Sequence, residues 1–264
     1  MAMDILDLRD FYSRPLGEFA RRILRGKLRE RWSDVRGMRV LGIGFATPFV
    51  GVFREDAERV LAFSPSQQGV AGWPLDRPHA AGLVDDEMWP LPDAAVDRIV
   101  AVHALETCGS ATEFLNEAWR CLAPGGRLIA IVPNRRGAWA KLDTTPFGYG
   151  RPFSRSQLTE LLREALFAPE GWDEALFMPP VERGLVFRSA APLERLGARL
   201  WAPFAGVHIV EASKQAVRPL PARSPRRGMR SSSACSPSSS PPASPGSPPS
   251  PPWSTPCLRR GRSL

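Results

Sequence analysis

The sequence predicts an α/β fold built on a mostly parallel sheet. Along residues 38–212, apolar stretches of strand length alternate with amphipathic stretches of helix length, and tight glycine turns adjoin two of the apolar stretches. A Gly-Ile-Gly turn at 42–44 closes the first stretch, and a Pro-Gly-Gly turn at 124–126 leads into a later one. Strands that alternate with helices imply a sheet with both faces covered.

Length and composition place limits on the kind of protein. A chain of 264 residues is expected to form one domain with room for a tail. No apolar run approaches the ~18 residues of a membrane-spanning helix, and no secretory signal is visible, so we expect a cytoplasmic protein. The cysteines form no CxxC pair and the three histidines are scattered, so no metal site is expected.

The net charge of +8 belongs to the C-terminal segment. Residues 218–264 contain eight arginines and no acidic residue, whereas residues 1–217 carry equal numbers of basic and acidic side chains. This removes the main argument for a specific nucleic-acid partner. The Pro/Ser/Arg composition of 217–264 predicts a disordered tail. A functional basic tail and a translated frameshift are two further readings, and the sequence leaves them open.

Two helices are expected before the first strand, and together they form a cover segment at 1–34. Asp4–Tyr12 reads as a short helix, and Arg14–Trp32 as a longer one with apolar residues at helical spacing. The opposite face of the longer helix is basic, which would suit a membrane surface or RNA. A cover helix with a solvated basic face is favoured, because Glu18 and Glu30 interrupt the charge.

The later elements follow from periodicity and from stop signals. Ala111–Leu122 is amphipathic and ends at the Pro-Gly-Gly turn, and Ser154 is a plausible N-cap for a helix to Ala165. The expected strands are 38–43, 59–63, 81–84, 96–103, 127–132, 173–178 and 207–212. The other expected helices are 49–57 and 193–201, with some helical character at 65–73.

In a parallel sheet, ligands bind where strands end, near the point of strand-order reversal. The Gly-Ile-Gly turn follows the first strand, Ser64 the second, Asp85 and Asp86 the third, and His103 the fourth. His103 is a candidate base, although local hydrogen bonding is the commoner use of such a histidine. The loop 144–151 is a candidate substrate lid, because it is long and contains glycine.

Three stretches resemble the class I S-adenosylmethionine-dependent methyltransferases, in the broad group related to quinone-biosynthesis enzymes. Val40–Pro48 is similar to the glycine-rich first motif of that family. Asp85–Val100 resembles its acidic and Pro-Leu-Pro-Asp pattern, and Glu117–Val132 resembles its helix, Pro-Gly-Gly turn and fifth strand. Together they cover about residues 35–135.

The resemblance implies a three-layer Rossmann-like sandwich. Its seven-stranded sheet would be mostly parallel with an antiparallel last strand, within a domain at 35–216. The resemblance also implies S-adenosylmethionine as cofactor, with the glycine turn near the methionine part, Asp85 and Asp86 near the adenine, and His103 near the methyl side. The implied cofactor-binding residues are Gly42, Gly44, Phe45, Ala46, Thr47, Ser64, Asp85, Asp86 and His103.

The sequence departs from the family at two positions. Gly42 and Ser64 stand where the family has acidic residues, and the second of these normally accepts both ribose hydroxyls. The expected function is methyl transfer to a small molecule or a protein side chain, without an identified acceptor or catalytic residue. The alternative is a catalytically inactive interaction or regulatory module.

Overall fold

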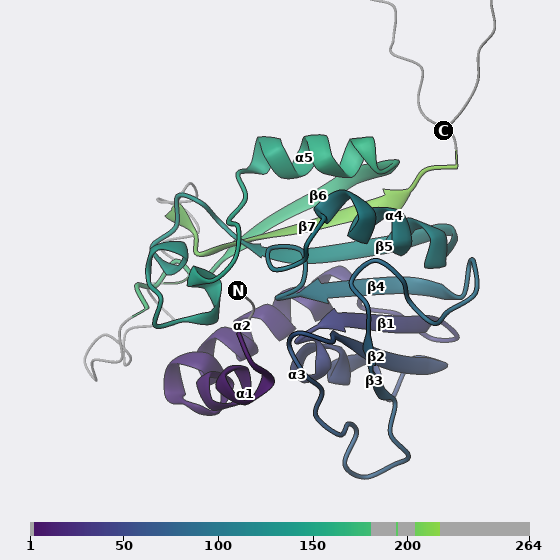
Figure 1. Cartoon of the computed structure of the whole chain (residues 1–264), viewed down its shortest axis with the longest axis horizontal. Helices are drawn as coiled ribbons and strands as arrows, with labels where there is room; N and C mark the ends of the chain where they lie inside the picture. The colour runs from purple at the N-terminus through teal and green to yellow at the C-terminus, as the bar shows by residue number, and fades with distance from the viewer. Residues whose placement is uncertain (1–2, 181–193, 195–203, 217–264) are drawn as a thin grey trace, which may run out of the picture. The chain divides into compact units, whose positions relative to one another are not determined.

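The structure, a computed structural model, describes residues 3–180, 194 and 204–216. The chain divides into two units at residue 219, and the fold below is that of the first unit. Its sheet has seven strands in the order β3-β2-β1-β4-β5-β7-β6 (Figure 1). The strands are β1 Arg39–Gly44, β2 Arg59–Pro65, β3 Ala81–Val84, β4 Val96–Val102, β5 Leu122–Pro133, β6 Phe167–Ala175 and β7 Val207–Lys214.

The strand directions confirm the predicted fold class. Neighbours from β3 to β5 run parallel, whereas β7 runs antiparallel to both β5 and β6. The chain builds outward from β1 through β2 to β3 and then returns to form β4 on the other side of β1. The strand order therefore reverses between β1 and β4, which is where open α/β sheets bind their ligands.

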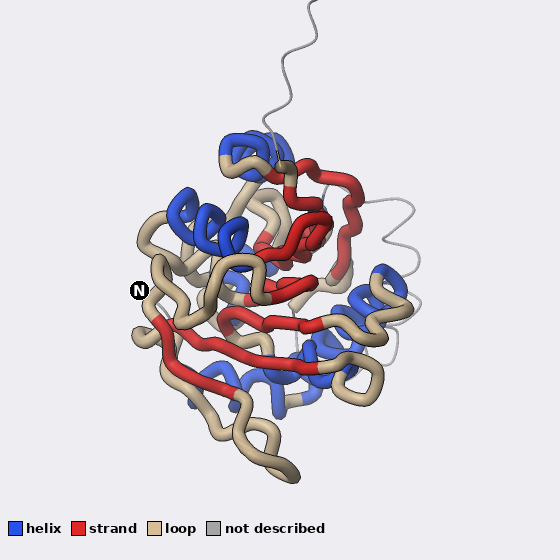
Figure 2. Tube along the Cα trace, turned by 90° about the vertical axis from the view of Figure 1, so that its right-hand side faces the viewer, coloured by secondary structure: helices blue, strands red, loops and turns tan. Residues whose placement is uncertain are grey.

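Helices cover both faces of the sheet, as Figure 2 shows. One face carries α1 (Ile5–Ser13), α2 (Pro15–Arg31) and the short α3 (Thr47–Val50), and the other carries α4 (Ala111–Cys121) and α5 (Arg155–Glu164). Three 3-10 turns complete the described elements, namely η1 (Gly51–Phe53), η2 (Trp139–Lys141) and η3 (Pro146–Gly148). No helix within the described ranges is long and apolar enough to cross a membrane.

Two hydrophobic clusters hold these layers together. On β4, Val100 and Val102 pack with the N-terminal helices, while Ile99 and Ala101 pack with α4 and α5. This division follows from the two-residue repeat of a strand, which turns alternate side chains to opposite faces. A strand segment buried on both faces therefore reads as a continuous apolar run, as 99–102 does.

Helix α2 packs against the sheet, as expected for a cover helix. Its Leu24 and Leu28 are fully buried. At its end, Arg31 donates to Asp173 through Nε at 2.9 Å, and the indole of Trp32 donates to Glu211 on β7 at 2.9 Å. The basic face of the helix is thus partly paired with carboxylates of the domain.

Several predicted boundaries differ from the structure. The expected helix at 49–57 is the shorter pair α3 and η1, and segment 65–73 forms turns without a helix. Strand β5 already begins at Leu122, so the Pro-Gly-Gly turn lies inside the strand. The ladder between β4 and β5 accommodates it through a register shift between Val96 and Arg98.

The sixth strand lies earlier than predicted, at 167–175 instead of 173–178. It pairs only with β7, at the edge of the sheet, and most of its residues are half-buried. An edge strand of this kind has no apolar run to reveal it, and Pro169 and Gly171 further mask its pattern. The helix expected at 193–201 and the tail at 217–264 lie outside the described residues, apart from Glu194.

The close contact between Gly44, at the end of β1, and the end of β4 can be tested by substitution. Its φ is +82°, and a Cβ there would lie 2.2 Å from the carbonyl oxygen of Val102. We expect Gly44→Ala to lower the free energy of unfolding by about 2 kcal/mol or more, from left-handed strain and the clash. Urea denaturation measures this.

Gly26→Ala in α2 is the matched control, because a Cβ there would meet nothing within 4 Å. This control is expected to raise the free energy of unfolding by up to about 1 kcal/mol, since alanine favours a helix. Equal effects of the two substitutions would contradict the packing described for Gly44.

Candidate functional site

The turn after β1 is held between the ends of two neighbouring strands. The backbone N–H of Phe45 donates to the carbonyl oxygen of Val102 at 2.9 Å, at the end of β4. On the other side, the Ser64 hydroxyl of β2 donates to the carbonyl oxygen of Gly44 at 3.3 Å and is buried. The structure thus brings together Gly44, Phe45 and Ser64, three of the predicted site residues.

Gly42 and Ala46 serve the packing of α3 on β1. A Cβ at Gly42 would lie 2.6 Å from the Cβ of Ala46 and 3.0 Å from a methyl group of Val50. Ala46 is fully buried, and Thr47 is the first residue of α3. The glycine at 42 is therefore required by the contact between helix and strand, whatever the turn binds.

His103, directly after β4, is the centre of a buried polar chain. Its Nε2 lies 2.7 Å from the Tyr12 hydroxyl of α1, and its Nδ1 lies 3.1 Å from Oε1 of Glu106. All three residues are buried. An ionised carboxylate only accepts hydrogen bonds, so Nδ1 carries the proton and Nε2 accepts from the tyrosine.

Three segments far apart in sequence cover this chain. The Tyr12 ring stacks on Phe45 at 5.4 Å, and Phe147, from η3 in the predicted lid, lies 4.8 Å from the His103 ring. The Gln68 amide, just beyond β2, donates to the carbonyl oxygen of His103 at 3.2 Å. The N-terminal helix, the segment after β2 and the loop after β5 therefore meet above the turn.

Two acceptor oxygens in this cluster have no hydrogen-bond partner. They are Oε1 of Gln68 and Oε2 of Glu106, and both atoms are buried. Burial and the nearby Glu106 charge raise the pKa of Tyr12 well above its usual value, so its phenol stays neutral. The site thus offers a buried carboxylate and an amide oxygen, each with unused capacity to accept a hydrogen bond.

Asp85 and Asp86 lie at the end of β3, two strands away from β1. Asp85 is exposed and accepts from the backbone N–H of Glu87 at 2.9 Å. Burial and the charge of Asp85 raise the pKa of Asp86, whose own charge acts on Cys108 after β4. Within the described ranges, neither carboxylate forms a hydrogen bond or ion pair with the turn or with His103.

Four residues that surround His103 are not among the site residues predicted from the sequence. Glu106 lies three residues after His103 in the stretch that follows β4, but the sequence alone assigns it no role. Tyr12, Gln68 and Phe147 come from separate segments, and no spacing in the sequence connects them with β4. Among the described residues no group of three or more His, Cys, Asp or Glu side chains is placed to hold a metal ion.

Comparison with known proteins finds similarity to methyltransferases in the central part of the chain. Residues 35–130 match the methyltransferase domain family. A probable S-adenosylmethionine-dependent methyltransferase of Mycolicibacterium smegmatis is 39% identical over 83 residues, which is 31% of this chain and 32% of that protein. The matched region thus spans about a third of the length of that curated relative.

Solved structures share the fold at low identity. A possible histamine N-methyltransferase of Thermotoga maritima has a TM-score of 0.55 at 19% identity, covering 78% of this chain and 93% of that one. A putative methyltransferase of Haloferax volcanii, solved with a methyltransferase activator, has a TM-score of 0.57 at 16% identity, with coverage of 81% and 100%. The cyclase SpnF has a TM-score of 0.52 at 23% identity, with coverage of 74% and 81%.

The fold and the family match agree on the same residues. The seven-stranded sheet has methyltransferase folds among its structural neighbours, and the matched domain at 35–130 spans β1 to most of β5. The comparisons give no support to the alternative of an inactive module, and the resemblance to the quinone-biosynthesis group stays a prediction. The match over residues 35–130 and the 39% identity over 83 residues make this part of the chain similar to S-adenosylmethionine-dependent methyltransferases.

Proposed function

We propose that this protein transfers the methyl group of S-adenosylmethionine to a small-molecule or protein acceptor. The observation that carries the proposal is the polar chain at His103, which stands beside the glycine turn where the strand order reverses. His103 and Glu106 lie within the part of the chain that matches the methyltransferase domain, and Tyr12 comes from α1, which precedes it.

The sulfonium of the cofactor supplies an activated methyl group, so the protein's main task is to align the acceptor for in-line attack. A hydroxyl or amine acceptor releases a proton as the new bond to the methyl carbon forms. Nε2 of His103 is suited to take it, because the contact of Nδ1 with Glu106 orients the ring. In this mechanism the acceptor attacks the methyl group directly, so the protein supplies no nucleophile.

We propose that the residues present accommodate the cofactor although acidic residues are missing at two positions, Gly42 and Ser64. A carboxylate is missing at the end of β2, and the Ser64 hydroxyl already donates to Gly44. Gln68, three residues beyond β2, has a buried Oε1 without a partner. We propose that this oxygen accepts from a ribose hydroxyl in place of the missing carboxylate, and that the buried Glu106 carboxylate faces the positive charges of the cofactor.

Access to these groups requires a movement of the cover. Phe45, Ala46, Ser64 and His103 are buried, with Tyr12 and Phe147 packed against the aromatic and imidazole rings. We propose that α1 or the loop at 144–151 opens to admit the cofactor. Asp85 and Asp86 remain the proposed adenine contacts, and Gly42, Gly44 and Thr47 the proposed frame of the methionine part.

The remaining assignments extend this proposal to the whole chain. The catalytic domain is proposed at 35–216, preceded by the cover helices at 1–34 and followed by the Pro/Ser/Arg-rich segment at 217–264, which lies outside the described residues. We propose a cytoplasmic location. No specific nucleic-acid partner is proposed, because residues 1–217 carry equal numbers of basic and acidic side chains.

Cofactor binding tests the proposal and the role of Gln68 together. Calorimetric titration with S-adenosylhomocysteine is expected to show binding to the full chain. Gln68→Leu is expected to weaken binding by about tenfold to a hundredfold, the cost of a lost buried hydrogen bond. Gln67→Leu, at the exposed neighbouring position, is the matched control and should bind as the wild type does.

Absence of binding at millimolar S-adenosylhomocysteine would contradict the methyltransferase proposal itself. Equal affinities of the two leucine variants would instead remove only the role of Gln68. Circular dichroism of each variant checks that the fold is intact.

The hydrogen bond between Tyr12 and His103 is testable through stability. Tyr12→Phe leaves the buried Nε2 of His103 without its donor, so the free energy of unfolding should fall by about 1–3 kcal/mol. Tyr149→Phe, in the loop after β5, is the control and should change it by less than about 0.5 kcal/mol. Indistinguishable urea midpoints for the two variants would show that the bond does not stabilise the fold.

A further inference from the structure

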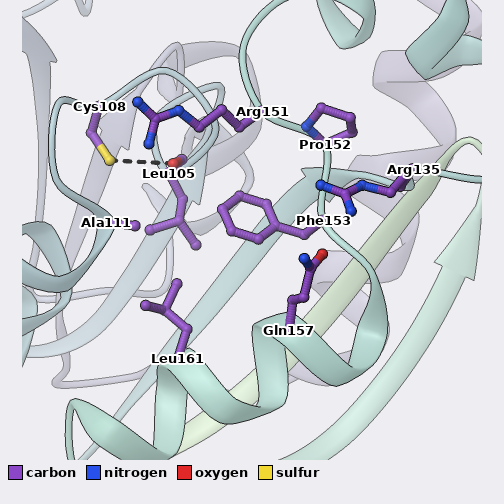
Figure 3. Close-up of a pocket in the computed structure, with 9 residues that line it drawn as sticks. All are labelled: Leu105, Cys108, Ala111, Arg135, Arg151, Pro152, Phe153, Gln157 and Leu161. Atoms are coloured by element: carbon purple, nitrogen blue, oxygen red, sulfur yellow. Dashed lines mark hydrogen bonds between the residues drawn. The ribbon is translucent and has the colours of Figure 1, made fainter.

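A second feature of this edge is a pocket between the ends of β4 and β5 and the first turns of α4 and α5. Its volume is about 270 Å³. Figure 3 shows the Phe153 ring in the middle of the view, with Leu105, Ala111 and Leu161 on one side of it. These four side chains give the pocket an apolar wall of the kind that small-molecule sites present.

The polar groups that line the pocket donate hydrogen bonds. Arg135 and Arg151 bring two guanidinium groups, and Gln157 brings a side-chain amide (Figure 3). Oε1 of Gln157 already accepts from the Ser154 backbone at 3.1 Å in the cap of α5, which leaves its N–H groups for a ligand. Within the described residues, neither arginine forms an ion pair with a carboxylate.

Backbone contacts hold both arginines at fixed positions, although their side chains are exposed. The N–H of Arg151 donates to the carbonyl oxygen of Glu106 at 2.8 Å, and the N–H of Arg135 donates to that of Phe153 at 3.0 Å. Gly150, with φ +79°, lets the loop press on Glu106, because a Cβ there would lie 2.3 Å from the same carbonyl oxygen. The pocket is therefore joined directly to the His103–Glu106 segment.

The pocket has binding groups but lacks a reactive one. Cys108 lies in its wall, and burial raises the pKa of this thiol to about 12, so it stays protonated. An array of donors beside an apolar wall selects a ligand with a negative head group and an apolar body. Guanidinium groups match a carboxylate in particular, because both are planar and can form paired hydrogen bonds.

We propose that this pocket binds the methyl acceptor, and that the acceptor is a small carboxylate with a single-ring aromatic or short aliphatic body. Arg135, beside the Gln157 amide, holds the carboxylate, and Arg151 adds positive charge on the other side of the Phe153 ring (Figure 3). Phe153, Leu105 and Leu161 enclose the apolar body. The volume limits the body to about one ring. The acceptor role rests on the proposed function, whereas the ligand class rests on the pocket alone.

Calorimetry on the full chain tests the ligand class with three probes: 3-phenylpropanoate, its neutral amide 3-phenylpropanamide, and inorganic phosphate. The carboxylate should bind at least about tenfold more tightly than the amide, because the amide leaves the guanidinium groups without a charged partner. Phosphate should bind more weakly than the carboxylate, because it leaves the apolar wall uncovered. Equal binding of amide and carboxylate, or tighter binding of phosphate, would overturn the ligand class.

Variants of the pocket residues test where 3-phenylpropanoate binds. The double variant Arg135→Gln/Arg151→Gln should weaken 3-phenylpropanoate binding by about tenfold or more. The matched control is Arg136→Gln, an exposed neighbour outside the pocket. Ala111→Phe, which fills the pocket from α4, should also abolish binding. An effect of Arg136→Gln as large as that of the double variant would overturn the location.

Titration with S-adenosylhomocysteine separates this proposal from the proposed function. The double variant should bind S-adenosylhomocysteine as the wild type does. Cofactor binding without carboxylate binding overturns the pocket proposal alone. Carboxylate binding without cofactor binding to the wild type contradicts the methyltransferase function, and with it the acceptor role of the pocket.

Discussion

The close contact between the turn after β1 and the end of β4 organises the rest of the site. Gly44 lies against the carbonyl oxygen of Val102 with no room for a side chain, and Phe45 donates to the same oxygen. This contact fixes the point at which the strand order reverses. It also sets the positions of His103 after β4 and of the Phe45 ring, on which Tyr12 packs.

The buried chain that follows from this contact gives the site its chemistry. Tyr12, His103 and Glu106 come from α1 and from the segment after β4, and Gln68 reaches the same point from beyond β2. A cover of this kind shields the proposed base from water, and it also covers the turn after β1. The same residues therefore serve stability and the proposed catalysis, so their variants need both a stability and a binding measurement.

The sequence predicts the strands and the carboxyl-end loops because local patterns encode them. Buried strand segments such as 99–102 are continuous apolar runs, and Ser154 signals the start of α5 through its capping box. The sequence therefore predicts that one edge of the sheet carries Gly44, Phe45, Ser64 and His103. Asp85 and Asp86 follow β3 at the same edge, two strands from β1, and among the described residues they form no hydrogen bond with the turn or with His103.

Other features depend on tertiary contacts that no local pattern reports. The edge strand β6 has no apolar alternation, and Tyr12 and Phe147 reach His103 from segments 91 and 44 positions away along the chain. The two arginines likewise line one pocket only because the loop at 150–153 docks on Glu106 and on the end of β5. Such positions become functional candidates only once the chain is folded.

The central claim is that this edge holds the cofactor with an amide oxygen in place of the usual carboxylate. A crystal structure of the protein soaked with S-adenosylhomocysteine tests it most directly. We expect the ligand above the turn after β1, with a ribose hydroxyl within hydrogen-bond distance of Oε1 of Gln68. We also expect Tyr12 to be displaced from His103. A ligand bound elsewhere, with the hydrogen bond between Tyr12 and His103 intact, would contradict it.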